Sequence, residues 1–435
     1  MARRRRGIAA FSVLALSALA LVGLLHFGAL PSPPPTSAVT ALPAAPAGIS
    51  IQKLIDATPP GGTVTPPPGR YEESLVIRKP ITLDGRGEVQ LDAGGEGSVI
   101  RLLTDGATIT GLELRGSGES HDRIDSGVQV RGDHNRITDN RIEDCLFGVD
   151  LGQSNENLLQ RNRISSKPLS MGLRGDGIRL WYSRENQILD NELSNIRDVV
   201  VWYSEANVIA RNSVTGARYA LHFMYSKANR VEENHYFDNM VGIFLMYSDG
   251  VRIERNRITD GHGATAMGIG FKESSDVVIR GNVILNYAKA IYLDISPYEP
   301  DTINLFEDNQ IGYNGAGILF HNDWHSNVFR RNDFHGNFTQ VAVRGGGSAN
   351  RNTWEDNHWD DYEGFDRDGD GYGDTPYELY AYADRFWVDM PPAAFFRGSP
   401  LFEAIDFLDR LAPFTDPTLI VRDEQPRFRA VQGAP

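Results

Sequence analysis

Cysteine is almost absent from this chain of 435 residues, because Cys145 is the only one. A single cysteine excludes an intrachain disulfide, and we expect Cys145 to be a small buried apolar residue. Positive charge is also scarce, since the formal net charge is −14. This balance argues against nucleic acid as a partner, because phosphates require basic patches. It also argues against binding of anionic polymers unless a cation bridges the two.

Helical periodicity is missing too, and an asparagine repeat stands in its place. The triplet Asn-x-hydrophobic recurs at intervals of 21 to 29 residues, at Asn140, Asn162, Asn191, Asn212, Asn234, Asn256, Asn282, Asn309, Asn332 and Asn357. Eight of these ten copies have a second asparagine five residues earlier. Such a repeat indicates one supersecondary unit that is stacked many times. Short alternating segments between Asn, Gly, Asp and Ser predict an all-β fold, a right-handed parallel β-helix.

Each asparagine is expected to lie at a bend, because this residue tolerates positive φ and its amide can bond the next coil. Two alternating rows then follow from strand geometry. The row expected to face inward is apolar throughout and contains Ile178/Leu180, Val199/Val201, Leu221/Phe223, Ile243/Leu245 and Ile269/Phe271. The row expected to face outward contains Arg179/Trp181, Val200/Trp202, His222/Met224, Phe244/Met246 and Gly270/Lys272.

The two ends of the chain differ from the repeats. Arg3 to Arg6 and the apolar run from Ile8 to Leu30 predict an export signal or membrane anchor, and residues 1–47 are assigned to this signal and a Pro/Ala-rich linker. The β-helix is expected over 48–358, with looped insertions at 165–175, 260–266 and 295–303. Residues 359–435 break the period and include a predicted helix from Ser399 to Leu411. We expect this segment to cap the solenoid and to dock on a partner.

Three stretches together carry a family resemblance: the opening GRYEESLVIRKPITLDG, the [WFM]YSxxN coils and the tail from DDYEGFDRDGDGYGDTPYELY to LFEAIDFLDRLAPF. They resemble the NosD family, which serves maturation of nitrous oxide reductase. The resemblance implies a periplasmic protein that works with an ABC transporter made of the NosF ATPase and the NosY membrane permease. It also implies NosL, a copper chaperone, as a partner, and assembly of the copper–sulfide centre of nitrous oxide reductase as the role. Copper would then be a transient cofactor.

The outward row offers the best set of soft ligands. His222, Met224 and Met246 lie on adjacent predicted rungs, and thioether and imidazole groups suit Cu(I). Two other interpretations remain open: a packing strip covered by a loop or by the tail, and a surface that docks a partner. The predicted partner-binding residues are Trp181, Trp202, Leu401, Ile405 and Leu408.

An acidic loop in the tail predicts a hard-ligand site of another kind. Alternating carboxylates with glycine at the sixth place resemble half of a calcium loop, and the residues concerned are Asp366, Asp368, Asp370, Tyr372 and Asp374. The glutamate expected at the twelfth place is missing, so an acidic turn held by its own side-chain bonds is the alternative. Structural calcium is the predicted cofactor here, whereas Cu(I) is not expected at such oxygens.

Catalysis is not expected, although a carbohydrate-binding or polysaccharide-processing β-helix is the competing function. Enzymes of that kind need paired carboxylates on one face. Asp360 and Asp361 are a candidate pair, but in a strand they would point to opposite faces. A further histidine group is expected to face solvent or flank the asparagines without converging on a metal, and it comprises His321, His325, His335 and His358.

Overall fold

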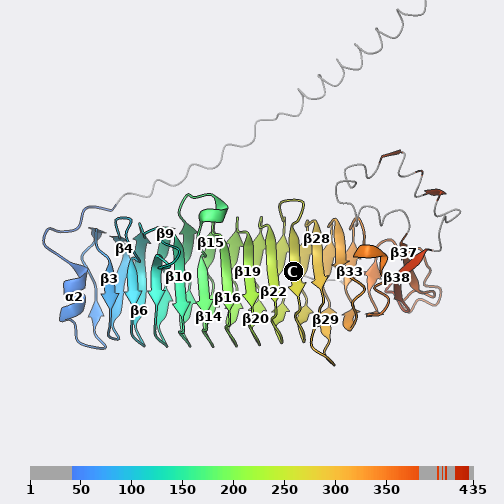
Figure 1. Cartoon of the computed structure of the whole chain (residues 1–435), viewed down its shortest axis with the longest axis horizontal. Coiled ribbons are helices and arrows are strands. Elements are labelled where there is room, and N and C mark those ends of the chain that lie inside the picture. The colour runs from blue at the N-terminus through green and yellow to red at the C-terminus, as the bar shows by residue number, and fades with distance from the viewer. Residues whose placement is uncertain (1–41, 382–398, 401–403, 405–406, 409–416, 431–435) are drawn as a thin grey trace, which may run out of the picture. The chain divides into compact units, whose positions relative to one another are not determined.

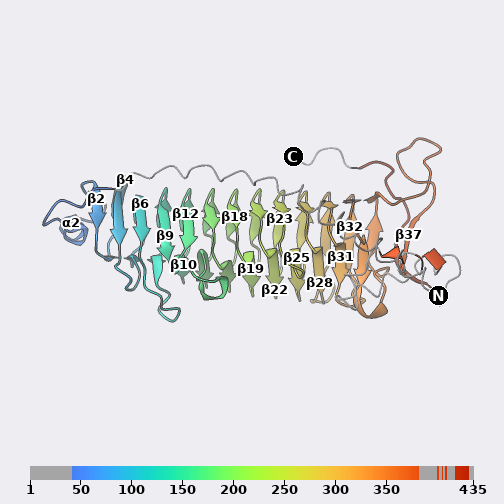
Figure 2. The ribbon, with the colours of Figure 1, turned by 90° about the horizontal axis from the view of Figure 1, so that it is seen from above.

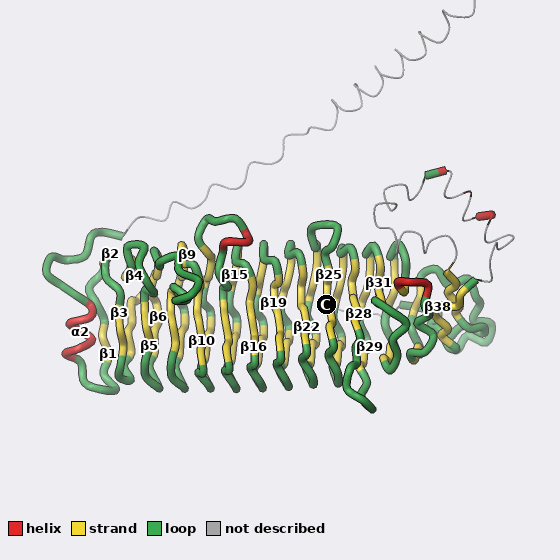
Figure 3. Tube along the Cα trace, viewed as in Figure 1, coloured by secondary structure: helices red, strands yellow, loops and turns green. Residues whose placement is uncertain are grey.

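The computed structural model describes residues 42–381, 399–400, 404, 407–408 and 417–430. Their regular structure is nearly all strand, wound into successive coils of a parallel β-helix (Figures 1 and 3). A typical coil has three short strands, as in β16 (Asp198–Trp202), β17 (Val208–Ala210) and β18 (Ser213–Thr215). The prediction of an all-β parallel β-helix is therefore confirmed. The predicted signal lies almost wholly in residues 1–41, outside the described residues.

One face of the β-helix is a sheet of twelve parallel strands. Besides β16, its strands are β3 (Leu75–Ile77), β5 (Ile100–Leu102), β7 (Ser126–Val130), β10 (Phe147–Gly152), β13 (Ile178–Trp181), β19 (Tyr219–Met224), β22 (Val241–Met246), β25 (Met267–Lys272), β28 (Lys289–Asp294), β31 (Ala316–Phe320) and β34 (Val341–Val343). Most of the candidate site lies on this sheet.

The other two faces are joined through the long strands β4 (Thr82–Asp92) and β6 (Thr108–Arg115). The first face continues with β1 (Thr63–Val64), β8 (Arg136–Thr138), β11 (Leu158–Gln160), β14 (Gln187–Leu189), β17, β20 (Arg230–Glu232), β23 (Arg252–Glu254), β26 (Val278–Arg280), β29 (Asn304–Glu307), β32 (Asn327–Arg330) and β35 (Thr353–Glu355). The second continues with β2 (Gly69–Tyr71), β9 (Arg141–Cys145), β12 (Arg163–Ser166), β15 (Glu192–Ser194), β18, β21 (His235–Phe237), β24 (Arg257–Thr259), β27 (Val283–Leu285), β30 (Gln310–Gly312), β33 (Asp333–His335) and β36 (His358–Trp359).

The core is formed by the inward row of side chains, as predicted. These residues are each at most 4% exposed, and they are Ile178/Leu180, Val199/Val201, Leu221/Phe223, Ile243/Leu245 and Ile269/Phe271. Cys145 is also fully buried, and this burial raises the pKa of its thiol to about 12. A thiol that stays protonated is unreactive, so Cys145 is the apolar core residue that the sequence suggested.

Two ladders of buried asparagines hold neighbouring coils in register. Asn212 shows the pattern: its Oδ1 accepts from Asn191 N at 3.0 Å, while its Nδ2 donates to Ile188 O at 2.8 Å and to Asn234 Oδ1 at 3.0 Å. Each rung thus donates to both neighbouring coils and accepts from the coil before it. This satisfies polar groups that would otherwise be buried without partners.

The expected backbone role of these asparagines is wrong. One of the two ladders runs from Asn140 to Asn357. In this ladder the residue before each asparagine has φ between 52° and 63°, namely Asp139, Arg161, Asp190, Arg211, Glu233, Arg255, Gly281, Asp308, Arg331 and Asp356. The bend lies at the surface, where a charged side chain reaches solvent, and the asparagine turns inward just after it. Several of these charges pair between coils, as Arg211 Nε does with Asp190 Oδ1 at 2.7 Å.

Three insertions leave the coils at the predicted places, and they are visible in Figure 1 as loops above and below the strands. The first contains the short 3-10 helix η1 (Met171–Leu173). At the amino-terminal end, helix α2 (Ile51–Ala57) packs Ile51 and Ile55 into the core. Residues 43–45, at the end of the predicted linker, run beside β2, since Arg70 N donates to Pro43 O at 2.9 Å.

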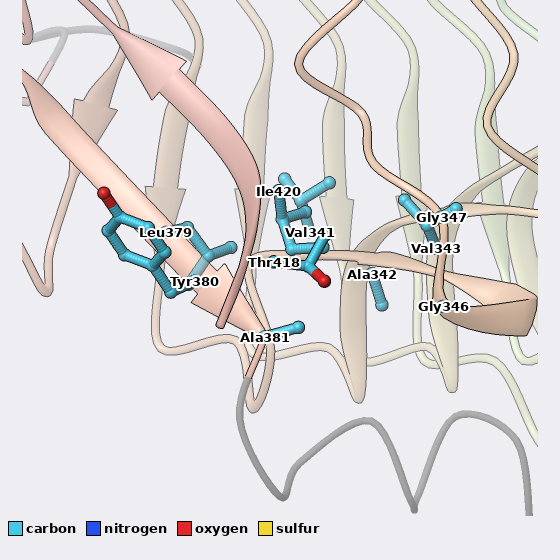
Figure 4. Close-up of a pocket in the computed structure, with 10 residues that line it drawn as sticks. All are labelled: Val341, Ala342, Val343, Gly346, Gly347, Leu379, Tyr380, Ala381, Thr418 and Ile420. Atoms are coloured by element: carbon cyan, nitrogen blue, oxygen red, sulfur yellow. The ribbon is translucent and has the colours of Figure 1, made fainter. Parts of the chain in front are cut away.

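At the other end the tail forms a hairpin of β37 (Tyr377–Ala381) and β38 (Thr418–Asp423), which Figure 2 shows beyond the last coils. Asp423 Oδ2 accepts from the backbone and side-chain nitrogens of Asn357, each at 3.0 Å. The hairpin also encloses a small cavity of about 20 Å³ with β34 and the 3-10 turn η2 (Arg344–Gly346) (Figure 4). The tail therefore caps the β-helix, as predicted. The predicted helix of 399–411 falls mostly outside the described residues.

Candidate metal centre

The predicted outward row exists as an in-register ladder on the twelve-stranded sheet. Trp181 of β13 pairs with Trp202 of β16, which pairs with Met224 of β19 and then with Met246 of β22. All four side chains are half-buried. The two indoles contact each other edge to face, with ring centroids 6.0 Å apart. Aromatic and thioether groups therefore form one continuous strip over four coils.

His222 lies beside this strip and meets one of its thioethers. The Nε2 atom of His222 is 3.3 Å from Met246 Sδ. The imidazole is only 7% exposed, and its Nδ1 is buried with no hydrogen-bond partner in the described structure. Three aromatic rings surround it: Tyr219 stacks at 4.9 Å, and the rings of Trp202 and Phe244 stand edge-on at 5.8 and 6.1 Å.

This surrounding sets the protonation state of His222. Burial lowers the pKa of the imidazole to about 4, against a raising effect from Asp198. At neutral pH the ring is therefore uncharged, and an uncharged imidazole is the form that ligates metals. A nitrogen and a thioether sulfur in an apolar recess are donors that suit Cu(I) rather than hard cations. The residues present thus fit a soft ion.

A buried ion-pair network next to the ladder went unnoticed in the sequence. Asp198 accepts from Arg218 Nε at 3.0 Å and from the backbone N–H of Tyr219 at 3.1 Å, and so fixes the ring that stacks on His222. Asp176 accepts from Arg197 Nη2 at 2.8 Å, and burial raises its pKa to about 6. The only available signal was that an acidic residue precedes each of two neighbouring apolar strands.

The three predicted copper ligands do not all lie equally close to one another. The structure brings the side chains of His222 and Met246 together. Met224 lies on the coil before Met246, and the two residues pair in the register of β19 and β22. The described residues of the tail hydrogen-bond to the end of the β-helix, for example to Ser348 and Asn357. Cover of the strip by a loop or by the tail stays a prediction.

The acidic loop closes on itself in the manner of the alternative interpretation. Asp366 accepts from the backbone nitrogens of Gly369 and Gly371 at 2.8 and 3.1 Å, and Asp370 accepts from Tyr372 N at 2.8 Å. Oxygens of Asp366, Asp368 and Asp370 nevertheless lie within 4.8 Å of one another, close enough to share a cation. Asp374 instead accepts from Arg367 N at 3.0 Å. Calcium binding here stays a prediction.

Two of the four later histidines take separate partners, and the other two share one. His321 Nδ1 lies 2.8 Å from the Tyr292 hydroxyl, and His325 Nδ1 lies 2.7 Å from Ser326 Oγ. His335 and His358 are half-buried rather than solvent-facing, because both contact the carboxylate of Asp333, at 3.3 and 2.7 Å. Burial opposes ionisation of Asp333, but the two imidazoles outweigh it and lower its pKa to about 2.

Asp360 and Asp361 do not alternate along a strand, so the expectation that they point to opposite faces is wrong. Strand β36 ends at Trp359, so both residues lie in the following turn, where alternation no longer applies. Their Oδ1 atoms both accept from Gln340 Nε2, at 2.6 and 3.5 Å. Two carboxylates that share one amide are held in place by it, and no basic group among their described hydrogen bonds completes a catalytic set.

One protein family and one bacterial relative are similar to this chain in sequence. A family described as "Periplasmic copper-binding protein (NosD)" matches residues 160–364. A Pseudomonas aeruginosa protein, "Probable ABC transporter binding protein NosD", is 29% identical over 397 residues, which cover 84% of this chain and 88% of that protein. The chain is similar in sequence to the NosD family. The NosD match includes every residue of the ladder and His222, and the family resemblance inferred from the sequence is confirmed.

The fold has wider relatives. A family described as "Right handed beta helix region" matches residues 97–196, which confirms the predicted hand of the β-helix. The Azotobacter vinelandii mannuronan C-5 epimerase AlgE6 A-module shares 18% identity, covers 70% of this chain and 92% of its own, and gives a TM-score of 0.55. The AlgE4 A-module gives 0.52 at 18% identity, with 68% and 94% covered. At this identity the likeness shows the fold alone. No helix among the described residues has both the length and the apolar character needed to cross a membrane.

Proposed function

We propose that this chain is a periplasmic, non-catalytic accessory protein that binds Cu(I) as cargo on the outer face of its β-helix. The observation that carries the proposal is the 3.3 Å approach of His222 Nε2 to Met246 Sδ. Buried histidines normally have hydrogen-bond partners on their ring nitrogens, whereas His222 Nδ1 has none among the described residues. Copper bound through Nε2 would require the proton to sit on Nδ1, which the neutral ring allows.

The printed descriptions of similar proteins support this function. The matching family is described as periplasmic and copper-binding, and the Pseudomonas aeruginosa relative is named for its association with an ABC transporter. In the finer proposal, the partners are the NosY permease with the NosF ATPase, the copper chaperone NosL and nitrous oxide reductase, whose copper–sulfide centre the chain helps to assemble. Calcium in the loop of Asp366 would be structural only.

We expect replacement of the His222–Met246 pair to weaken copper binding. The variant combines His222→Ala with Met246→Leu, a thioether-free side chain of similar volume. Loss of both donors should raise the Kd for Cu(I) at least about tenfold, equivalent to about 1.4 kcal/mol. The measurement is competition between the purified chain and the chromogenic Cu(I) chelator bicinchoninate.

A matched control replaces one histidine and one methionine elsewhere. His262→Ala with Met171→Leu changes an exposed loop histidine, whose Nδ1 lies 3.2 Å from Asp238, and a methionine of η1. The control should keep the wild-type Kd. Equal affinities for wild type and the His222–Met246 variant, with circular dichroism unchanged, would rule out this copper site.

The tail is proposed to dock on the transporter through its apolar residues. Leu401 and Ile405 lie outside the described residues, but Leu408 is 53% exposed. Leu408→Asp should reduce co-purification with the NosY–NosF transporter about tenfold, because a buried charge disrupts an apolar interface. The matched control is Leu54→Asp, at a leucine 37% exposed in α2 at the opposite end. If Leu54→Asp releases the transporter and Leu408→Asp does not, the docking surface lies at the other end.

The proposed partner surface also includes Trp181 and Trp202. Trp181 is covered on one side by Arg179, whose guanidinium lies 4.9 Å from the ring centroid, and on another by Tyr203 at 5.3 Å. Half-buried aromatic groups of this kind are frequent in interfaces. Their position beside His222 means that a protein docked on them would lie at the proposed copper site.

A further inference from the structure

A third methionine reaches the outer face beside the proposed copper pair, outside the two alternating rows of the repeat. Met267 begins β25, one coil after Met246. A β-carbon built on Gly270 would lie 3.5 Å from Met267 Sδ and would collide with the ring of Phe244. The sulfur and the phenyl ring therefore both lie over the bare backbone of Gly270.

Strand pairing places Gly270 in the row of His222. His222 of β19 pairs with Phe244 of β22, and Phe244 pairs with Gly270 of β25. Met246 flanks this row on one side, two residues beyond Phe244, and Met267 flanks it on the other. Since coils are about 4.8 Å apart, the Met267 sulfur lies roughly two coil spacings from His222, with the Phe244 ring in between.

Packing alone gives an incomplete account of this arrangement. Methionine often fills irregular gaps in cores, but Met267 is half-buried on the outer face, beside the sealed core of Ile269 and Phe271. Four of the seven methionines in the chain fall between residues 224 and 267, namely Met224, Met240, Met246 and Met267. A concentration of thioethers on three successive coils is better explained by soft-ion chemistry than by space filling.

We propose that Met267 is a second Cu(I) position, which exchanges the ion with the His222–Met246 pair past the Phe244 ring. This inference rests on the proposed function and extends it from one site to a short track along the coils. In the transfer, bonds from copper to His222 Nε2 and Met246 Sδ break and a bond to Met267 Sδ forms. All three donors are neutral, so copper remains Cu(I) and no electron or proton is exchanged.

The test is Cu(I) titration of the full chain against bicinchoninate. Wild type should bind about two equivalents, the weaker at Met267, because a single thioether is a poorer ligand set than imidazole with thioether. Met267→Leu keeps the side-chain volume and should bind about one equivalent, with the tighter Kd unchanged. Met171→Leu, the matched control in η1, should bind as wild type does.

The outcomes separate this inference from the function on which it rests. If Met267→Leu binds the same number of equivalents as wild type, the second position is wrong and the first stands. If Met267→Leu also loses the tighter equivalent, Met267 belongs to the first site and the track is wrong. A wild-type chain that binds no Cu(I) would overturn both.

Discussion

Asn212→Ala is expected to destabilise the β-helix by about 3 kcal/mol, because each buried group left without a partner costs about 1–3 kcal/mol. The substitution leaves the backbone N–H of Asn191 and the carbonyl of Ile188 without the partners that they have at 3.0 and 2.8 Å. It also removes the amide-to-amide bond with Asn234. Chemical denaturation followed by circular dichroism measures the change in the free energy of unfolding.

The matched control is Asn350→Ala, since Asn350 is exposed in a turn after η2. That variant should change the free energy of unfolding by less than about 0.5 kcal/mol, the usual range for surface substitutions. Because each coil of a solenoid contacts only its neighbours, the loss at Asn212 should begin locally. Faster hydrogen exchange in β15, β18 and β21 than elsewhere would show this. Equal stability of both variants would mean that the ladder is not stabilising.

The fold was readable from the sequence because the repeat is strict. An asparagine ladder needs the same side chain at the same place in every coil, so its chemistry appears directly as a period. The inward row followed from alternation alone, as Phe223 and Phe271 show, both fully buried. The bend was misplaced by one residue, because charged residues such as Arg161 and Asp190 occupy the positive-φ positions that asparagine is known to tolerate.

Only part of the candidate site could be predicted from the sequence. Register places His222 and Met246 on neighbouring rungs, and sequence reasoning could reach that far. The reach of Met267 over Gly270 depends on the direction of a flexible side chain and on a missing β-carbon three residues away. His335 lies two residues from Asp333 on β33, whereas His358 reaches Asp333 only through the pairing of β33 with β36, after an irregular stretch of chain. Contacts of this kind leave no period in the sequence.

The end of the ladder could not be predicted either, because its last member comes from a segment distant in sequence. Asp423 takes the place of a further asparagine: its Oδ2 accepts from Asn357 N and Nδ2, and from Trp359 Nε1 at 3.2 Å. Among the described residues no coil follows, so the last rung must accept hydrogen bonds but need not donate any. A carboxylate meets that requirement, whereas within the ladder it would lack the donor that each asparagine supplies.

Asp423→Ala should therefore release the tail from the β-helix. It removes the acceptor of the Asn357 backbone N–H and of the Trp359 indole N–H, and one of the two acceptors of Asn357 Nδ2, which still donates to Phe329 O. Two buried donors without partners cost about 3 kcal/mol or more. Since this carboxylate accepts three of the hydrogen bonds that join the hairpin of β37 and β38 to the last coil, the cap should open locally before the coils unfold. The measurement is limited proteolysis of the tail, whose cleavage should accelerate about a hundredfold if the opening equilibrium changes by about 3 kcal/mol.

Asp423→Asn keeps an acceptor oxygen and should show a smaller change. Glu424→Ala, at a neighbouring side chain 68% exposed, is the control that should cleave as wild type does. Equal cleavage of Asp423→Ala and Glu424→Ala would show that the packing of Tyr377 on Trp359, with ring centroids 4.4 Å apart, is sufficient to hold the cap.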